Sequence, residues 1–125
     1  MMEGLIYILE YAKRNLFIPG HVENWLTIMD CSSLSLTSFP RKKLEPTMHI
    51  LQNNFRARGF HTFAINVSMG IRMIYTIVSP FMESGVKRSF TINGSMKCKK
   101  LIKLFNPCQL EERFGGTAPN VENYW

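Results

Sequence analysis

Several patterns that would identify a protein class at once are missing from this chain of 125 residues. No stretch approaches the roughly 18 consecutive apolar residues that a membrane-spanning helix requires. The start has no basic segment ahead of an apolar run, as a secretory signal peptide would. The nucleotide-binding patterns GxGxxG and GxxxxGK[ST] do not occur. These absences argue against a membrane-spanning protein, a secreted protein and a nucleotide-binding enzyme.

Cysteine and histidine are scarce, with three of each in the chain. They are Cys31, Cys98, Cys108, His21, His49 and His61. An odd number of cysteines without a CxxC pair argues against a disulfide framework, and no spacing suits a zinc site. We therefore expect a reducing, cytoplasmic setting, no metal and no cofactor.

Asp30 is the single aspartate, and it follows a run of apolar residues that predicts a strand. Catalytic carboxylates occur at such strand ends, but a carboxylate that caps a turn or a helix is more common there. A nucleophilic pair of Cys31 with a histidine would need a spatial proximity that nothing in the sequence indicates. We expect that the protein is not an enzyme.

Basic residues dominate one segment of the chain, whose net charge is +6 overall. No acidic residue lies between Glu83 and Glu111. The basic residues in that interval are Lys87, Arg88, Lys97, Lys99, Lys100 and Lys103. Such a segment favours an anionic partner, in particular a membrane surface, although a solvated basic face is an equal alternative. Nucleic acid is disfavoured, because only two aromatic residues lie among these cations.

Apolar spacing and turn residues predict an alternation of helices and strands. Helices are expected over residues 4–16, 69–79 and 96–105, and strands over 25–29, 60–66 and 88–93. A further helix would have Ser38 as its N-cap and Pro40 just inside, and continue at helical spacing over 44–55. Because of Pro46 this helix either kinks in its first turns, which we favour, or begins nearer Glu45. The apolar run 25–29 suits a buried strand. This order is typical of an α/β domain with a mixed, mainly parallel sheet and crossover helices.

The stretch 67–83 is unusually apolar for a helix. Its polar residues (Arg72, Thr76, Ser79 and Glu83) are spaced four, three and four apart, which places them on one narrow stripe. The remaining residues cover far more than the apolar face of an ordinary surface helix. Two interpretations remain open, a core helix or one wall of a lipid cavity. Pro80 should weaken the last turn.

Five passages occur in an order that resembles one known family. They are "WLTIMD" followed by "CSSLSLTSFP", then "ILQNNFRARGFHTFAIN", "YTIVSPFMESGVKRSF" and "PCQLEERFGGT". In this order they resemble the CRAL-TRIO lipid-binding domain, over residues 5–117, with a tail at 118–125. The resemblance implies one domain over residues 1–125, shortened at its N-terminus, where the family has a helical lobe and two further strands.

The resemblance also implies a function and site residues. Members bind a hydrophobic ligand, here a phospholipid or other lipid, in an internal cavity and present or transfer it at membranes, which implies peripheral membrane association. The cavity residues would be Ile65, Met69, Met73, Ile74, Ile77, Val78 and Phe81. Lys87 and Arg88 would meet the headgroup phosphate, and Lys97, Lys99, Lys100 and Lys103 an anionic membrane surface.

Some positions depart from the family pattern. Ala57 stands where members that bind phosphatidylinositol have a glutamate, so the resemblance does not extend to that specificity. The closing Gly115-Gly116 pair is expected to permit a positive φ angle and close packing, with Phe114 as a buried anchor. The alternative function is a protein-interaction or regulatory module on the same fold that has a protein partner and transfers no lipid.

Overall fold

The computed structural model describes residues 2–35, 37, 46, 49–50, 53–55, 58–82 and 84–122, without the side chains of Met2, Val78 and Phe81. The chain forms two compact units. The first comprises Met1–Thr27 and Pro40–His61, and the second Ile28–Phe39 and Thr62–Trp125. Each unit is described by itself below.

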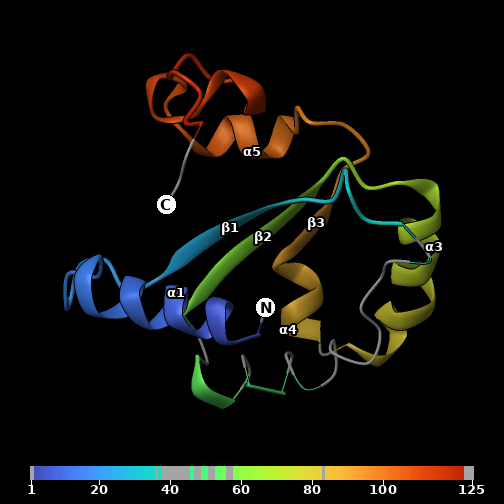
Figure 1. Cartoon of the computed structure of the whole chain (residues 1–125), viewed down its shortest axis with the longest axis horizontal. Helices are drawn as coiled ribbons and strands as arrows, with labels where there is room; N and C mark the ends of the chain where they lie inside the picture. The colour runs from blue at the N-terminus through green and yellow to red at the C-terminus, as the bar shows by residue number, and fades with distance from the viewer. Residues whose placement is uncertain are drawn as a thin grey trace. The chain divides into compact units, whose positions relative to one another are not determined.

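The described residues form helices and strands in mixed order along the chain (Figure 1). The order is α1 (Met2–Asn15), β1 (Trp25–Asp30), β2 (Gly59–Ile65), α3 (Met69–Val78), α4 (Ser84–Arg88), β3 (Phe90–Ile92) and α5 (Lys99–Leu104). One short 3-10 turn follows α3, η1 (Ser79–Phe81), and two follow α5, η2 (Pro107–Gln109) and η3 (Glu112–Phe114).

The strands form one sheet in the order β1-β2-β3. Strands β2 and β3 run parallel, with Thr62 opposite Phe90 and Ala64 opposite Ile92. This confirms the predicted α/β class and the parallel pairing. Strand β1 occupies an edge of the described sheet, and its side chains are half-buried or exposed. The expectation of a buried strand over 25–29 was therefore wrong, because an edge strand has a neighbour on one side only.

The predicted second helix lies mostly outside the described residues. Ser38, Pro40 and most of 44–55 belong to the part that is not described, as does the expected kink after Pro46. Helical backbone is described at Pro46, at 49–50 and at 53–54. Nothing more follows for this segment.

Helix α3 is bounded by two serines. At its start, the Ser68 hydroxyl oxygen accepts a hydrogen bond from the N–H of Ile71 (3.4 Å). At its end, Pro80 has no N–H for the carbonyl of Thr76, and the hydroxyl of Ser79 donates to that carbonyl instead (3.4 Å). The weakened last turn predicted from Pro80 is confirmed, since the α-helix stops at Val78.

Two elements are shorter than predicted. The third strand covers only Phe90–Ile92, and Arg88 ends helix α4, where the hydroxyl of Ser89 donates to the carbonyls of Gly85 and Val86. Helix α5 begins at Lys99 and not at 96, because the Asn93 side chain donates to the carbonyls of Ser95 and Lys97 and fixes a turn there. Side-chain hydrogen bonds to the backbone thus compete with the regular elements.

Each unit has its own apolar packing. In the second unit the core consists of Cys31, Ala64, Val67 and Ile71, packed against Leu34, Ile74, Phe90 and Ile92. In the first unit the ring of Trp25 lies between Phe17 and Phe55, with centroid distances of 5.6 and 5.8 Å. Burying one large apolar side chain stabilises a fold by about 1.5–3 kcal/mol.

The Gly115-Gly116 pair closes the last turns of the second unit. Gly115 has a φ of 100°, as expected for a glycine after a helical turn. A Cβ on Gly116 would lie 1.8 Å from the carbonyl oxygen of Leu110, so this position has no room for a side chain. The expected anchor was wrong: Phe114 is only half-buried, and Leu110, 4% exposed, is the buried side chain of this segment.

Candidate functional site

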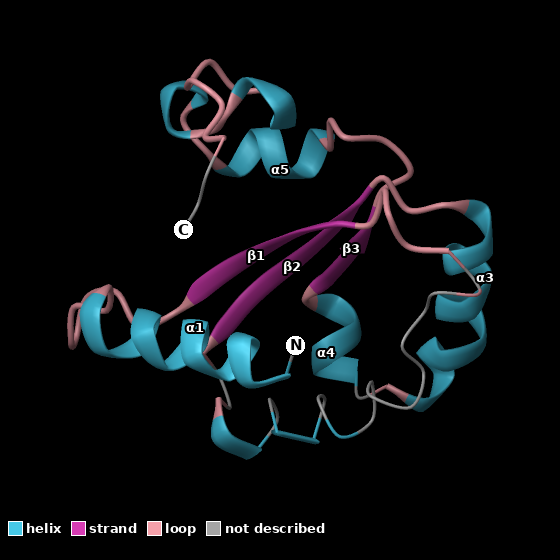
Figure 2. Cartoon of the chain, in the orientation of Figure 1, coloured by secondary structure: helices cyan, strands magenta, loops and turns pink. Residues whose placement is uncertain are grey.

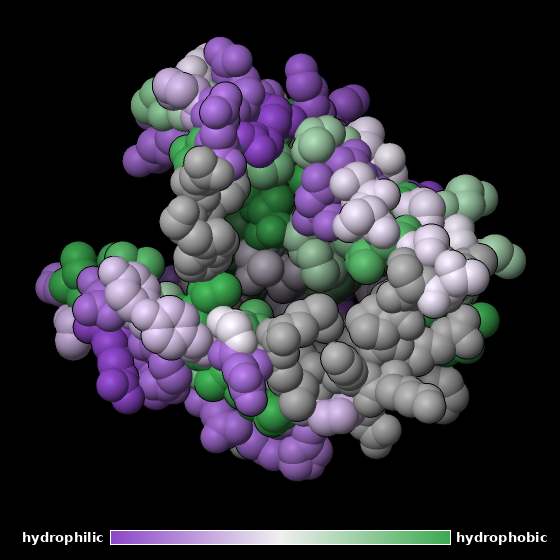
Figure 3. All heavy atoms as spheres, viewed as in Figure 1, coloured by the Kyte–Doolittle hydropathy of each residue, from purple (hydrophilic) through white to green (hydrophobic). Residues whose placement is uncertain are grey.

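The outer face of α3 carries large apolar side chains that are open to solvent. Met69, Met73 and Ile77 are 75%, 66% and 70% exposed. Their spacing of four residues places them on one side of the helix. We call these three residues the α3 stripe. In Figure 3, pale green and green spheres lie along the side of the view where Figure 1 draws α3.

The inner face of α3 holds the helix on the sheet. Ile71 is 8% exposed, Ile74 packs against the core cluster, and the ring of Tyr75 stacks on Phe90 with a centroid distance of 5.7 Å. The interpretation as a core helix is therefore correct for one face, which packs on the core cluster. The other face is apolar and exposed, and its interpretation as a wall of a lipid cavity stays a prediction.

The structure brings together three of the seven predicted cavity residues, the members of the α3 stripe. Ile65 is fully buried in β2 and Ile74 belongs to the inner face, so neither shares the surface of the stripe. The side chains of Val78 and Phe81 lie outside the described part. The assignment of these residues to a lipid site remains a prediction.

The predicted basic residues form two groups. Lys87 and Arg88 lie in the last turn of α4, just before β3 begins. Lys97, Lys99, Lys100 and Lys103 follow the other end of β3, on and before α5, and Figure 2 shows α4 and α5 at opposite ends of this strand. All six side chains are exposed. The segment that is continuous in sequence is therefore not one continuous basic face.

One cation near the second group was not predicted as a site residue. Arg72 belongs to α3 and is exposed, and its Nη2 lies 3.6 Å from the position that a Cβ on Gly94 would occupy. The guanidinium thus reaches the turn that precedes Lys97. The sequence indicated Arg72 only as part of a polar stripe, since nothing in the spacing showed which turn it would meet.

Asp30 has a structural role at the ends of β1 and β2. Its Oδ1 accepts hydrogen bonds from the side-chain amide of Asn66 and from the N–H of Ser32, both at 2.9 Å. The Asn66 hydrogen bond is the main cause that lowers the pKa of Asp30. Asn66 itself has a φ of 53°, which asparagine tolerates better than most residues.

The chemistry of Cys31 does not favour a nucleophile. Its thiol is 2% exposed, and burial, followed by the charge of Asp30, raises its pKa. A raised pKa reduces the thiolate fraction that nucleophilic attack requires. In the described part of the chain, no three His, Cys, Asp or Glu residues are grouped so as to hold a metal ion.

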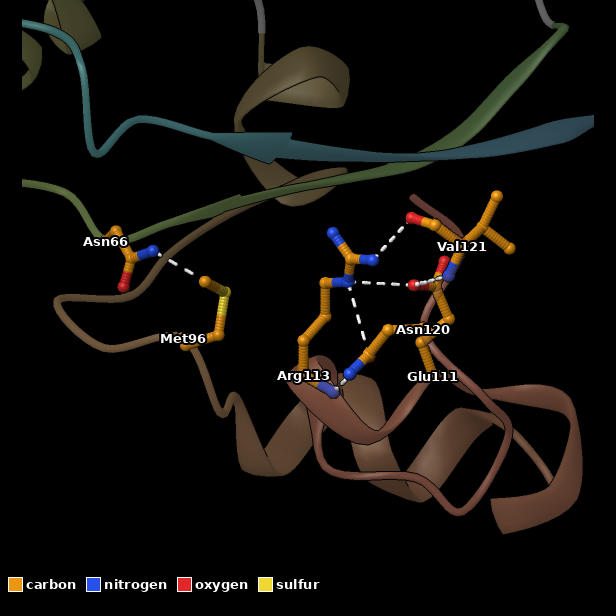
Figure 4. A network of polar contacts seen from close by, with 6 residues as sticks. All are labelled: Asn66, Met96, Glu111, Arg113, Asn120 and Val121. Atoms are coloured by element: carbon orange, nitrogen blue, oxygen red, sulfur yellow. Dashed lines mark hydrogen bonds and ion pairs between the residues drawn. The ribbon is translucent and has the colours of Figure 1, made fainter. Parts of the chain in front are cut away.

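Arg113 organises the end of the described chain (Figure 4). Its Nε lies 2.8 Å from Oε2 of Glu111, and its backbone N–H donates to Oδ1 of Asn120 at 2.9 Å. The guanidinium also donates to the carbonyl of Val121. These contacts stabilise the turn and engage the guanidinium of Arg113 within it.

None of the described helices combines the length and the apolar composition that crossing a membrane requires.

Known proteins are similar to this chain in sequence and in fold. The family model described as the CRAL/TRIO domain matches residues 1–116. The phosphatidylinositol/phosphatidylcholine transfer protein SFH11 of Arabidopsis thaliana is 23% identical over 113 residues, which cover 88% of this chain and 30% of that protein. Clavesin-1 of Xenopus laevis is 28% identical over 103 residues, which cover 78% of this chain and 30% of that protein. The chain thus spans less than a third of these relatives.

A solved structure, titled the crystal structure of Sfh5, shares the fold. It matches 75% of this chain and 33% of its own chain, with a TM-score of 0.59 and 15% sequence identity. The family model thus covers residues 1–116, and the structural match covers three quarters of the chain. The chain belongs to the CRAL/TRIO domain family.

Proposed function

We propose that this chain binds a hydrophobic ligand, a phospholipid or another lipid, and presents or transfers it at a membrane surface. The observation that carries the proposal is the α3 stripe, an apolar surface on a helix whose other face already completes the core. The family match supports it, as does the SFH11 relative, whose name describes lipid transfer.

The energetics favour a lipid partner for the stripe. Exposure of three large apolar side chains to water is unfavourable. Burying them against acyl chains lowers the free energy by about 0.8 kcal/mol per buried CH₂. Methionine suits such a contact, because its unbranched side chain adapts to irregular apolar surfaces. Met69 and Met73 supply this property in the stripe.

The exposed cations extend the proposal to the headgroup and the bilayer. Lys87 and Arg88 would contact the phosphate of the bound lipid, and the guanidinium of Arg88 can do so with two hydrogen bonds. The lysines around α5 would attract an anionic cytoplasmic surface, each contributing about 1 kcal/mol near the bilayer. We infer a peripheral protein with no enzymatic activity.

Lipid extraction after purification from a eukaryotic host tests the ligand. Native mass spectrometry of the full chain should show a stoichiometric adduct that extraction identifies as one lipid class. A folded protein without an adduct would contradict the proposal and favour the protein-interaction module.

Substitutions in the stripe test transfer itself. Met73→Asp and Ile77→Asp should reduce the rate of lipid transfer between vesicles at least tenfold, because a carboxylate cannot enter an apolar layer without large cost. Tyr7→Asp is the matched control: it puts the same charge in place of another apolar side chain, 68% exposed, on α1. Equal rates for all three variants and the unmodified chain would overturn the proposal.

A further inference from the structure

Four exposed cations lie close to the turn 93–96 that joins β3 to α5, three of them in sequence and Arg72 in space. Lys97, Lys99 and Lys100 follow the turn along the chain, and Arg72 reaches it from α3, with Nη2 3.6 Å from the Cβ position at Gly94. The structure pairs none of the four with a described carboxylate. Figure 3 shows purple, hydrophilic atoms over the region where Figure 1 places α5.

The same turn presents backbone donors. The side-chain amide of Asn93 donates to the carbonyls of Ser95 and Lys97, at 2.7 and 3.2 Å, and the N–H of Asn66 donates to the carbonyl of Ser95. These bonds use the carbonyls of the turn. Within the described residues, the N–H groups of Gly94, Ser95 and Met96 donate to no acceptor. Unpaired N–H groups in a turn are available as hydrogen-bond donors to an anion.

Glycine at position 94 brings the two sets of donors together. A Cβ there would stand 3.6 Å from the Arg72 guanidinium and 3.8 Å from the carbonyl oxygen of Val67. A larger side chain would occupy the space beside the guanidinium. With glycine, the cation and the N–H groups of the turn are open to the same small ligand.

We propose that Arg72, Lys97 and the N–H groups of Gly94–Met96 form a binding site for a phosphate group. Arginine suits a phosphate because its planar guanidinium donates two parallel hydrogen bonds. The site goes beyond the proposed lipid transfer, since it lies at the carboxyl end of β3, away from Lys87 and Arg88, and requires no filled cavity. The phosphate is either a free anion or part of a lipid headgroup.

One carboxylate is connected to this turn and would repel a phosphate. Asn66 links the turn to Asp30, since its backbone N–H donates to Ser95 and its side-chain amide to Asp30. Asp30 accepts from the N–H of Ser32 as well, so both bonds hold its charge against β1 and β2. Against this single carboxylate stand four cations, which leaves the turn with a positive local charge.

Titration of the full chain with inorganic phosphate tests the site. In amide NMR spectra at pH 7.5 and constant ionic strength, the signals of Gly94–Lys97 should shift and saturate. Arg72→Gln should weaken the affinity about tenfold, the loss expected for one charge-assisted hydrogen bond. Arg72→Lys should recover part of it, because the charge returns without the fork geometry.

The matched control is Arg14→Gln, which removes the same charge from a side chain that is 77% exposed on α1. It should leave the phosphate affinity unchanged. Shifts that never saturate, or equal affinities in R72Q and the unmodified chain, would overturn the site. Because Arg72 is exposed, R72Q should keep the dispersed spectrum of a folded protein, so a lost signal can be assigned to binding.

Vesicles separate the two sources of phosphate. If phosphatidic acid in phosphatidylcholine vesicles increases binding, and R72Q removes the increase, the site takes a lipid headgroup. If R72Q weakens only the binding of inorganic phosphate, the site takes a soluble anion. Either result supports the site. If R72Q changes neither the phosphate affinity nor the vesicle binding, the site is contradicted. Lipid extraction on R72Q keeps this test apart from the proposed function, since the bound lipid should remain.

Discussion

Helix α3 and the segment 107–120 belong to the same compact unit, but different interactions hold them in place. Side-chain packing holds α3, through Ile71, Ile74 and Tyr75. Backbone hydrogen bonds hold the C-terminal segment: the N–H of Thr117 donates to Pro107 at 2.7 Å, and the N–H of Ala118 donates to Leu110 at 3.0 Å.

The comparison separates residues that the fold requires from residues that it does not. In the C-terminal segment, glycine is required because the backbone of Leu110 lies too close to Gly116 for any side chain. On the outer face of α3, polar side chains would be compatible with the same helix. The apolar stripe there is consequently not required by the packing of the helix, which is compatible with the proposed lipid contact.

The largest effect is expected from Gly116→Ala. The new Cβ would overlap the carbonyl oxygen of Leu110 at 1.8 Å, so the turn must open, and we expect a loss of about 3 kcal/mol or more in the free energy of unfolding. Urea denaturation measures the loss.

Gly85→Ala is the control for this change. Gly85 lies in α4 with no atom within 4 Å of its Cβ position, so alanine should stabilise the protein by about 0.5–1 kcal/mol. Similar urea midpoints for the two variants would show that the close approach at Gly116 relaxes without cost. The contrast between α3 and the segment 107–120 would then disappear.

The two faces of α3 give the next largest difference. Ile71→Ala should destabilise the protein by about 2–4 kcal/mol, because it leaves a cavity beside the core. Ile77→Ala, at a position 70% exposed, should stay within about 0.5 kcal/mol of the unmodified chain. Thermal unfolding followed by circular dichroism compares the two. A large loss from Ile77→Ala would mean that the stripe contributes to folding after all.

Arg113→Ala probes the hydrogen bonds that close the C-terminal segment. The variant loses the ion pair with Glu111, the bond from Nε to Oδ1 of Asn120 (3.3 Å) and the bond to the carbonyl of Val121, but keeps the backbone N–H bond to Asn120. We expect a loss of about 1–2 kcal/mol, since the side chain is one third exposed. Hydrogen exchange of the amides of Phe114–Ala118 should accelerate as well. Unchanged exchange would show that the backbone bonds suffice without Arg113.

The smallest expected effect is the pH dependence of stability that arises from Asp30, the last residue of β1. The pKa of Asp30 is lowered in the folded state, chiefly by Asn66, so its contribution to stability is fully present above its unfolded-state pKa of about 3.9. The contribution is lost as the pH falls through the lower folded-state pKa. Asn66→Gly keeps the positive φ accessible but removes the amide donor.

Carbon-13 NMR titration of the Asp30 carboxyl checks this. Its pKa should lie below about 3.9 in the unmodified chain and rise in N66G. An identical pKa in both proteins would contradict the role assigned to Asn66.

Local patterns in the sequence were sufficient for the element types and for the family. The 3.6-residue spacing over α1 and α3, the alternation over β2 and the effect of Pro80 depend on neighbouring residues only. The errors concern burial and length. The exposure of β1 depends on its place at the sheet edge, and α4 ends with side-chain bonds from Ser89, which no pattern of hydrophobicity records.

The candidate site was less predictable for the same reason. The spacing of Met69, Met73 and Ile77 places them on one face, but spacing alone could not separate them from Ile74, which turns to the core. Arg72 was found only in the structure, because its partner turn lies more than twenty residues away in the sequence and is brought near by the packing of α3 on the sheet.

The two serines that bound α3 have a consequence for its freedom. Ser68 and Ser79 satisfy backbone groups at the helix ends from within the segment itself. Moving such a helix away from the sheet breaks apolar contacts, but it leaves these two hydrogen bonds intact. The free-energy cost of that movement therefore depends on the apolar area that the inner face buries. A lipid or a bilayer can replace these contacts with apolar contacts of its own.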